Sequence, residues 1–358
     1  MNLLKTTIRS INPKSSRGFS LVELMVAITV SLILLNGVMQ IFTGSKENYA
    51  IQEELSRLQE NGRFAMDVLT REMRMAGYLG CSSNAQIANS IDAGSGLYDL
   101  STPITGFEGG VDPVTDYGTT RYTDTDSFVI RFLNDNNAIV VTSHNPSSAV
   151  IHLAGTHALE KGEIYIIADS NCTQIGIFQM SGPNSGDVNH ISHNKGGSIS
   201  PGNCLKALKG NFDCDNQAAA VAAAYSAGST VVRLSAHEYY IGYYANAPGK
   251  SVPVLFRKDL SSAESPEEMI EGVEDLQILY GVDTNTDNAA NQYDTANAVA
   301  SWQNVVSVRI ALLLRTTREV ASKPQAYTFQ GVTHSSHTDG YLRREFTTTI
   351  QIRNKGLS

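Results

Sequence analysis

The chain of 358 residues lacks the short motifs that mark several common classes of enzyme. It contains no Gly-x-Ser-x-Gly sequence for a serine nucleophile, and none of its cysteines lies in a recognisable catalytic context. Its one candidate for a phosphate-binding loop, around Gly196 and Gly197, lacks the required spacing. A tethered enzyme or lectin would need a site in the middle of the chain, and the sequence shows none. We therefore expect the chain not to be an enzyme.

Positive charge is scarce over most of the chain. The net charge is −8, and four of the 27 Lys and Arg residues lie in the first 18 residues, which contain no acid. The remaining chain therefore has 23 basic and 35 acidic side chains, a net charge of −12. Because contacts with phosphates need a basic surface, this balance argues against nucleic acid as a partner.

Cysteine is rare, with only four residues in the chain, and four cysteines allow three pairings. Cys204 and Cys214 enclose a loop of nine residues and are the favoured local pair. Cys81 would then pair with Cys172. This second disulfide would connect the end of a long helix, which we expect over residues 19–77, to the β-rich head that we expect after it. All four follow the segment expected to cross the membrane, so they lie in an exported part where disulfides persist.

The most distinctive feature that is present is a long apolar run near the start. Residues 19–42 contain no proline and only one charged residue, Glu23. A helix of this length spans about 36 Å, which is enough to cross a bilayer. The basic residues before it predict a cytoplasmic leader, residues 1–18, and an exported head. A carboxylate in such a helix is costly, so we expect Glu23 to have a functional partner.

Residues 18–24, Gly-Phe-Ser-Leu-Val-Glu-Leu, with the apolar run behind them resemble the class III signal of type IV prepilins and type II pseudopilins. The resemblance implies that a membrane prepilin peptidase cleaves after Gly18 and methylates the new amino terminus at Phe19. It also implies that Glu23 neutralises the terminal amine of a neighbouring subunit and sets the register of assembly. An amine is a suitable partner for a carboxylate buried among packed helices.

Two other interpretations of this segment stay open. One is an ordinary N-terminal membrane anchor in which Glu23 has no special role. The other is a secretory signal peptide, which would be cleaved at small residues after the apolar run. Ser31 and Gly37 offer little for such a cleavage, and the helical pattern continues beyond the run. The prepilin signal is therefore favoured.

The helix is expected to continue through residues 43–77 as an amphipathic segment. Apolar and small residues recur at spacings of three and four, which is the period of one helical face. They are Ile51, Leu55, Leu58, Gly62, Ala65, Leu69, Met73 and Ala76. We expect this face to dock on the sheet of the head, with Gly77 ending the helix.

From residue 78 to residue 358 the sequence is typical of strands and loops. Alternating apolar residues predict a large, mostly antiparallel β head, so the fold class is α+β. The expected strands are residues 127–133, 138–142, 149–153, 163–168, 174–180, 230–234, 238–244, 252–256, 269–280, 305–315 and 345–353. We expect loops over 82–124 and 181–203, a short helix over 218–224 and a helical turn at 265–267.

Several further segments resemble PilW-type minor pilins of type IV pili. They are residues 61–65 (NGRFA), 71–81 (REMRMAGYLGC), 273–283 (VEDLQILYGVD) and 308–315 (VRIALLLR), with 343–346 (RREF) and 353–354 (RN). The resemblance covers the first 81 residues and most of the last quarter of the chain, and it leaves residues 82–265 as a variable head. It implies the type IV pilin fold, in which a long N-terminal helix packs on a β head.

The resemblance also implies a role and partners. The chain would be a structural subunit of the initiation or tip complex that primes pilus assembly, supports twitching motility and helps to present a tip adhesin. Its partners would be other minor pilins, the major pilin, the inner-membrane platform, the prepilin peptidase and a PilY-family tip adhesin. It would lie in the inner membrane with a periplasmic head before assembly, and in the pilus afterwards. The alternative is a J-type pseudopilin of type II secretion, but those are usually shorter and residues 77–81 (GYLGC) favour PilW.

An acidic loop over residues 283–294 resembles an EF-hand calcium loop. Oxygen ligands fall at its relative positions 1, 3, 5, 9 and 12, namely Asp283, Asn285, Asp287, Asn291 and Asp294. The loop has Asn288 where an EF-hand has glycine, and its last ligand is an aspartate rather than the longer glutamate. A solvated loop between two strands is the favoured interpretation, and calcium is the alternative. We expect no other cofactor.

Tyrosine and histidine clusters have simple structural interpretations. The tyrosines are Tyr239, Tyr240, Tyr243 and Tyr244, and the paired histidines are His190 with His193 and His334 with His337. Tyrosine is enriched at interfaces, but pairs on a strand are more simply core on one face and surface on the other. The histidine spacing is unlike that of common zinc sites, so zinc is not expected.

Overall fold

The structure is a computed structural model. It describes residues 18, 20–80, 85–92, 98–109, 120–184, 186, 188–196, 199–243, 252–262, 265–321, 323–337 and 339–354. The chain divides into two compact units, Met1–Glu53 and Glu54–Ser358. We consider each unit by itself.

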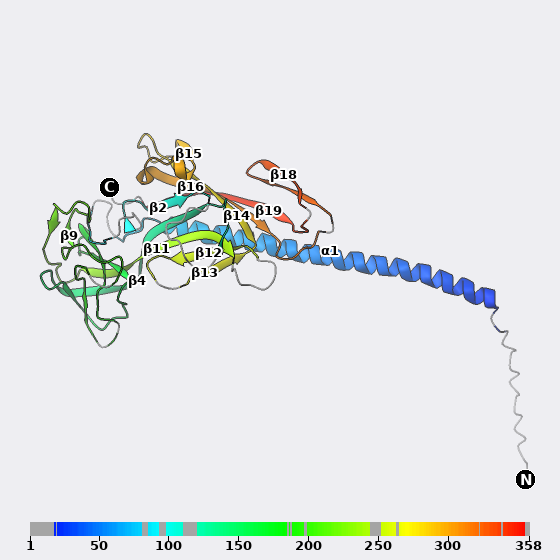
Figure 1. Cartoon of the computed structure of the whole chain (residues 1–358), viewed down its shortest axis with the longest axis horizontal. Coiled ribbons are helices and arrows are strands. Elements are labelled where there is room, and N and C mark those ends of the chain that lie inside the picture. Colours follow the sequence, from blue (N-terminus) through cyan, green and yellow to red (C-terminus); the bar gives the residue numbers. More distant parts are fainter. Residues whose placement is uncertain are drawn as a thin grey trace, which may run out of the picture. The chain divides into compact units, whose positions relative to one another are not determined.

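One helix of 55 residues, α1 (Leu21–Met75), confirms the long helix that the sequence predicted (Figure 1). It contributes residues to both units. In the first unit the side chains from Leu21 to Phe42 are exposed, with Leu21 at 72% and Phe42 at 65%. An 18-residue window of this helix has a mean hydropathy of 2.2 and none of it is buried. By length and composition the helix can cross a membrane.

In the second unit, one face of α1 packs into the head. Its buried residues are Glu54, Leu58, Gly62, Ala65, Val68, Leu69 and Met73. The predicted apolar face is therefore confirmed from Leu58 onwards, whereas Ile51 and Leu55 are half-buried. Glu54 is a carboxylate that the apolar pattern did not place inside.

The end of α1 is fixed by Gly77 and by the last described residue of the chain. Gly77 has a φ of +73°, which favours glycine, and its N–H donates to the carbonyl of Arg131 at 2.8 Å. A Cβ at Gly77 would lie 2.4 Å from the backbone oxygen of Asn354. The Asn354 side chain in turn donates to the carbonyls of Arg74 and Ala76, at 3.4 and 3.3 Å. The predicted helix stop is confirmed.

The larger sheet of the head follows the strand order β1-β7-β6-β11-β4-β5-β8, with β2 beside β4, β3 and β12 beside β11, and β13 beside β12. Its strands are β1 (Gln86–Asn89), β2 (Ile104–Phe107), β3 (Thr120–Arg121), β4 (Ser127–Asn145), β5 (Val150–Leu153), β6 (Ile164–Ala168), β7 (Gln174–Gln179), β8 (His190–Ser192), β11 (Thr230–Tyr243), β12 (Val254–Asp259) and β13 (Glu267–Glu271). Only β1 and β7 pair in parallel among these described strands.

A second sheet of four antiparallel strands has the order β15-β14-β16-β19. Its strands are β14 (Val273–Val282), β15 (Gln292–Asp294), β16 (Val305–Arg315) and β19 (Arg343–Gln351). Two small hairpins complete the described strands, β9 (Lys209–Gly210) with β10 (Ala220–Val221) and β17 (Gln325–Phe329) with β18 (Val332–His337). Two 3-10 turns, η2 (Ala296–Ala298) and η3 (Trp302–Asn304), connect β15 to β16.

The main hydrophobic core lies between α1 and both sheets. Helix residues Leu58, Ala65 and Leu69 join buried residues of β2, β4, β11, β14 and β16 in one cluster. Asp126, at the start of β4, connects the two sheets: its N–H donates to the Leu276 carbonyl and its Oδ2 accepts from the Ile278 N–H, both at 2.8 Å. Burial raises the pKa of Asp126 to about 6, although backbone hydrogen bonds oppose the shift.

The strand prediction was right in type for most segments but wrong in several places. Residues 127–142, predicted as two strands, form part of the single strand β4, and the two predicted strands between 230 and 244 form β11. The predicted loop over 82–124 contains β1, β2 and β3.

Two predicted helical pieces are extended instead. In the predicted helix at 218–224, Ala220 pairs with Gly210 in a small hairpin, and a Cβ at Gly210 would lie 2.0 Å from the Ala219 oxygen. Such close backbone contact overrides the helix preference of alanine. The predicted helical turn at 265–267 leads directly into β13, which pairs with β12.

Candidate functional site

The N-terminal signal lies at the exposed start of α1. Glu23 is in the first turn and exposed, and the Leu24 N–H donates to the Ser20 carbonyl at 3.0 Å. Among the residues that the structure describes, none has an atom within 4 Å of the place that a Cβ at Gly18 would occupy. Phe19 lies outside the described residues, so cleavage, methylation and the pairing of Glu23 stay predictions.

Apart from Glu23, the first unit offers little polarity between residues 21 and 42. The hydroxyls of Thr29 and Ser31 donate to carbonyls of their own helix, at 2.9 and 2.7 Å. These side chains are therefore satisfied without water. The segment can pack in lipid or among other apolar helices, with the Glu23 carboxylate as its one charged group.

Polar contacts fix α1 on the head in the second unit. Glu72 lies 3.7 Å from Nδ1 of His237 and 3.8 Å from Nη1 of Arg257. Burial works against ionisation of Glu72, but His237, Tyr239 and Arg257 outweigh it, so the pKa of Glu72 lies below its usual value. Arg257 also contacts Glu267 on β13 at 2.5 Å. Helix and sheet are thus joined by a chain of ion pairs at this point.

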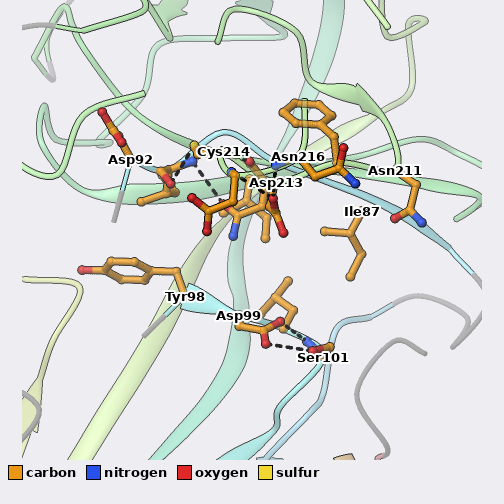
Figure 2. A pocket seen from close by; sticks show the side chains of 15 residues that line it. Ile87, Asp92, Tyr98, Asp99, Ser101, Asn211, Asp213, Cys214 and Asn216 are labelled. Carbon is orange, nitrogen blue, oxygen red and sulfur yellow. Dashed lines mark hydrogen bonds between the residues drawn. The ribbon is translucent and has the colours of Figure 1, made fainter. Parts of the chain in front are cut away.

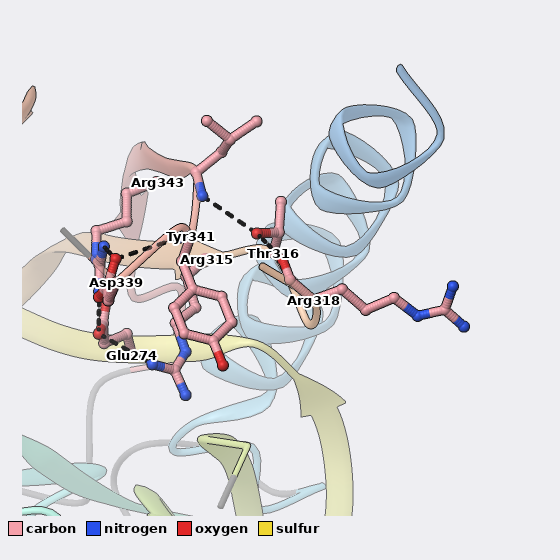
Figure 3. A network of polar contacts seen from close by, with 8 residues as sticks. Glu274, Arg315, Thr316, Arg318, Asp339, Tyr341 and Arg343 are labelled. Atoms are coloured by element: carbon pink, nitrogen blue, oxygen red, sulfur yellow. Dashed lines mark hydrogen bonds and ion pairs between the residues drawn. The ribbon is translucent and has the colours of Figure 1, made fainter. Parts of the chain in front are cut away.

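A second network connects β19 to β14 across the strand β16 that lies between them (Figure 3). Arg343 donates to both carboxylate oxygens of Glu274, at 2.6 and 2.9 Å, and also to both oxygens of Asp339, at 3.1 and 2.5 Å. The Arg343 side chain is only 4% exposed. These charge-assisted bonds raise the pKa of Arg343 despite its burial.

One cavity of the head, of about 480 Å³, lies beside a disulfide (Figure 2). Cys214 lines it and is bonded to Cys204, so the favoured local disulfide is confirmed. Cys172 is also disulfide-bonded, but Cys81 lies outside the described residues and their pairing stays a prediction.

Two of the four acids that line this cavity accept hydrogen bonds within their own loops. Asp99 accepts from the N–H and hydroxyl of Ser101, at 2.9 and 2.8 Å. Asp213 accepts from the N–H groups of Asp215 and Asn216, at 3.0 and 2.7 Å. These are turn contacts of the kind that aspartate commonly makes. Within the described residues, this cavity shows loop-capping carboxylates and no nucleophile paired with a base.

The candidate calcium loop is also explained by its own hydrogen bonds. Asp283 is 4% exposed and accepts from the N–H groups of Thr286 at 2.6 Å and Asn288 at 2.8 Å. Asn291 accepts from Thr284 at 2.7 Å, and Asp294 accepts from the Gln292 side chain at 2.7 Å.

The segment is therefore a loop between the two strands β14 and β15, which is the interpretation that the sequence favoured. Asp287 likewise accepts from the Ala289 N–H at 2.8 Å. Among the described residues, no three acidic, histidine or cysteine side chains converge on a place for a metal ion. The three acidic candidates, Asp283, Asp287 and Asp294, therefore form no such group, and calcium binding stays a prediction to be tested.

The tyrosine pair on β11 is core on both faces. Tyr239 and Tyr240 are each 0% exposed, Tyr239 stacking on Phe128 and Tyr240 on Phe256. The prediction that one of the pair faces solvent was wrong, because Tyr239 packs in the main core and Tyr240 packs in a separate cluster with Val254 and Phe256.

A buried histidine pair was missed by the spacing analysis. Nε2 of His193 lies 3.0 Å from Nε2 of His144, and the Tyr225 N–H donates to Nδ1 of His144 at 3.2 Å. Burial lowers the pKa of His144 to about 4 and that of His193 to about 3. The pair joins β4 to the end of β8, and its two members are 49 residues apart in sequence, so no local motif could reveal it.

Comparison with known families agrees with this geometry at both ends of the chain. Residues 13–37 match the prokaryotic N-terminal methylation motif, and residues 238–354 match the family described as Type IV Pilus-assembly protein W. No curated protein matches the chain significantly. The first match contains Glu23 and the start of α1. The second contains strands β12 to β19, the Arg343 network and the Asn354 cap. The two matches lie at opposite ends of the chain, and together they are consistent with a PilW-type minor pilin.

Proposed function

We propose that this minor pilin is a structural subunit of the complex that initiates a type IV pilus, and that it helps to present an adhesin at the pilus tip. The observation that carries the proposal is the exposed apolar part of α1, with Glu23 as its one charge, in a chain whose head matches the PilW family over residues 238–354. An apolar helix of this kind packs among other helices, and a large head offers surface for partners.

The route to the pilus follows from the N-terminal signal. The leader, residues 1–18, stays in the cytoplasm, and the peptidase cleaves after Gly18 and methylates Phe19. Glu23 then pairs with the terminal amine of a neighbouring subunit as α1 leaves the membrane. The head lies in the periplasm before assembly and at the pilus tip afterwards.

The chain works by packing and recruitment rather than by catalysis. Its partners are other minor pilins, the major pilin, the inner-membrane platform and a PilY-family adhesin. Asp99 and Asp213, which line the cavity beside the disulfide, accept hydrogen bonds from their own loops. This supports a structural rather than a chemical role for that region.

Deletion of the gene tests the proposal, scored for surface pili and twitching on one hand and for protein secretion on the other. We expect pili and twitching to be lost while secretion continues. Loss of secretion with normal pili would instead assign the chain to the J-type pseudopilins. If neither property changed, the assembly function itself would be wrong.

A further inference from the structure

A small polar cavity lies in the second unit where α1 first becomes buried. Its volume is about 210 Å³. Its lining, which we call the Glu54 cavity, consists of Glu54, Arg57, Leu58, Asn61, Glu271, Arg315, Thr316 and Thr317. The helix supplies one wall, and the end of β16 with the residues after it supplies the other.

Glu54 is an unusual residue for this position. It is 3% exposed, and it is the first residue along α1 that is buried. Among the residues that the structure describes, the buried Oε1 has no hydrogen-bond partner, and Oε2 accepts a long bond from Thr317 at 3.3 Å. A buried carboxylate oxygen without a donor is strongly disfavoured.

The ion pair between Glu54 and Arg318 does not satisfy this oxygen. Nε of Arg318 lies 4.0 Å from Oε1, at the limit of an ion pair, and the Arg318 side chain is 70% exposed. Figure 3 shows Arg318 extending away from the cluster of Glu274, Asp339 and Arg343. An exposed pair at this distance contributes little.

Three other residues with donor groups that line the cavity contact groups other than the Glu54 carboxylate. Asn61 donates to the Glu271 carbonyl at 3.3 Å, and Thr316 donates to the Arg318 carbonyl at 2.8 Å. Arg315 lies 3.7 Å from Glu274 and its guanidinium stacks over Tyr341 at 4.3 Å.

The charged residues that line the Glu54 cavity also leave the Glu54 carboxylate without a close cation. Glu54 and Glu271 bring two negative charges to the lining. Arg57 and Arg315 bring two positive ones, but Arg315 also faces Glu274 outside it. What the cavity lacks is a further cation that can donate a hydrogen bond to Glu54.

We propose that the Glu54 cavity receives the cationic side chain of a lysine or arginine from a neighbouring pilin subunit. This inference rests on the proposed function, because it takes assembly to bring such a subunit against α1. A long, flexible stem with a charged end suits a narrow polar cavity beside a helix. Ordered water, the competing occupant, could donate to Oε1 but would leave the buried charge unneutralised.

The first test uses the full chain in detergent micelles and measures the melting temperature. Glu54→Gln keeps the size of the side chain and removes its charge, and Glu60→Gln on the exposed side of α1 is the matched control. We expect Glu54→Gln to melt at the same temperature as the wild type or higher, because the isolated chain loses an unpaired buried charge. A fall of several degrees, with no change for Glu60→Gln, would show that Glu54 already has its partner within the chain and would overturn the proposal.

The second test measures assembly in the native host, as the amount of this chain per amount of major pilin in sheared pili. We expect Glu54→Gln to lower it about tenfold, the loss of one charge-assisted hydrogen bond. Glu54→Asp should restore part of the signal and Glu60→Gln should match the wild type. Incorporation of Glu54→Gln at the wild-type level would leave water as the only occupant and overturn the proposal.

A charge reversal then identifies the partner. Glu54→Lys should abolish incorporation, and changing the contacting Lys or Arg of one of the host's pilins to Glu should restore it. Failure of every such reversal would overturn the assignment to a pilin side chain. The gene deletion separates this inference from the proposed function: if deletion removes pili while Glu54→Gln does not, the function stands and the inference falls. If deletion leaves pili intact, the proposed function itself falls.

Discussion

Gly62 is the position where docking of α1 on the head can be tested most sharply. An added Cβ there would lie 2.3 Å from Cζ and 2.4 Å from Cε2 of Phe346. Carbon atoms pack at about 3.5–4.0 Å, so the ring would have to retreat by more than about 1 Å. The backbone of Phe346 is held opposite Leu312 by the pairing of β19 with β16, so the half-buried ring must make this space by turning about its own side-chain torsions.

Two effects of opposite sign decide the outcome of Gly62→Ala. Replacing glycine inside a helix stabilises it by about 1 kcal/mol. Overpacking a fitted contact costs about 1–3 kcal/mol, and the displaced Phe346 ring loses part of its burial as well. We therefore expect a net loss of about 1–2 kcal/mol, or about 2–4 °C in melting temperature for a chain of this size.

Gly44→Ala is the matched control, since no atom lies within 4 Å of its Cβ position on the same helix. It should leave the melting temperature unchanged or raise it. Trp302, the single tryptophan, packs against the same core and Tyr280 at 4.8 Å, so its fluorescence reports the unfolding.

A double-mutant cycle with Phe346→Ala completes the test. Removing the ring gives the new methyl group its space, so the double variant should be more stable than the sum of the single losses predicts, by about 1 kcal/mol or more. Additive losses, or a Gly62→Ala chain that is as stable as Gly44→Ala, would refute the reasoning.

Four further predictions test other parts of the chain. Arg343→Ala should cost about 3 kcal/mol of unfolding free energy in urea, because it leaves Glu274 and Asp339 unpaired, while Arg344→Ala on the exposed side should cost little. The free energy of unfolding should fall on acidification from about pH 6.5 towards pH 4, because His144 and His193 have lowered pKa values and protons bind preferentially to the unfolded chain. The variant His193→Gln should show a weaker dependence of stability on pH, and an unchanged dependence would count against the role of this pair. Gly18→Trp should leave an unprocessed precursor on a gel, and a band of mature size would show that cleavage lies elsewhere. Calorimetry of calcium with the purified chain should show no binding heat at the acidic loop, and heat that disappears in Asp283→Asn would contradict the structure.

Local patterns were sufficient for the parts of the chain with strong periodicity. The apolar face of α1 from Leu58 to Met73 follows directly from a spacing of three and four, and the strand over residues 305–315 was predicted with its observed bounds. Both elements are long and regular, so local signal and tertiary packing agree.

Other features depend on contacts that no local pattern contains. The alanine-rich segment at 218–224 has a helical preference, but pairing with Gly210 holds it extended. Tyr239 and Tyr240 are both buried because each packs in a different hydrophobic cluster. The His144 and His193 pair meets only after β4 and β8 have come together through β5.

Glu54 was missed for a different reason. A glutamate beside an apolar stripe is read as the polar border of a helix, and nothing in the sequence shows that the chain after β16 covers it. The contact depends on Thr317, which is 263 residues away. A position at which the local sequence pattern gives the wrong burial is expected to be a functional or strained site.

The two units divide the work of the proposed subunit. The first exposes an apolar helical segment, residues 21–42, with Glu23 as its one carboxylate, and the second is stabilised by a core shared between α1 and two sheets. Ion pairs at Glu72 and the Asn354 cap keep the rest of the helix on the head.

The most direct test of the account is mass spectrometry of this chain recovered from purified pili. We predict an N-terminal peptide that begins at Phe19 and carries one added methyl group, present in pili and depleted when Glu23 is changed to Ala. A chain that keeps residues 1–18, or one that is absent from pili in cells that make both the pili and the protein, would contradict the central claim.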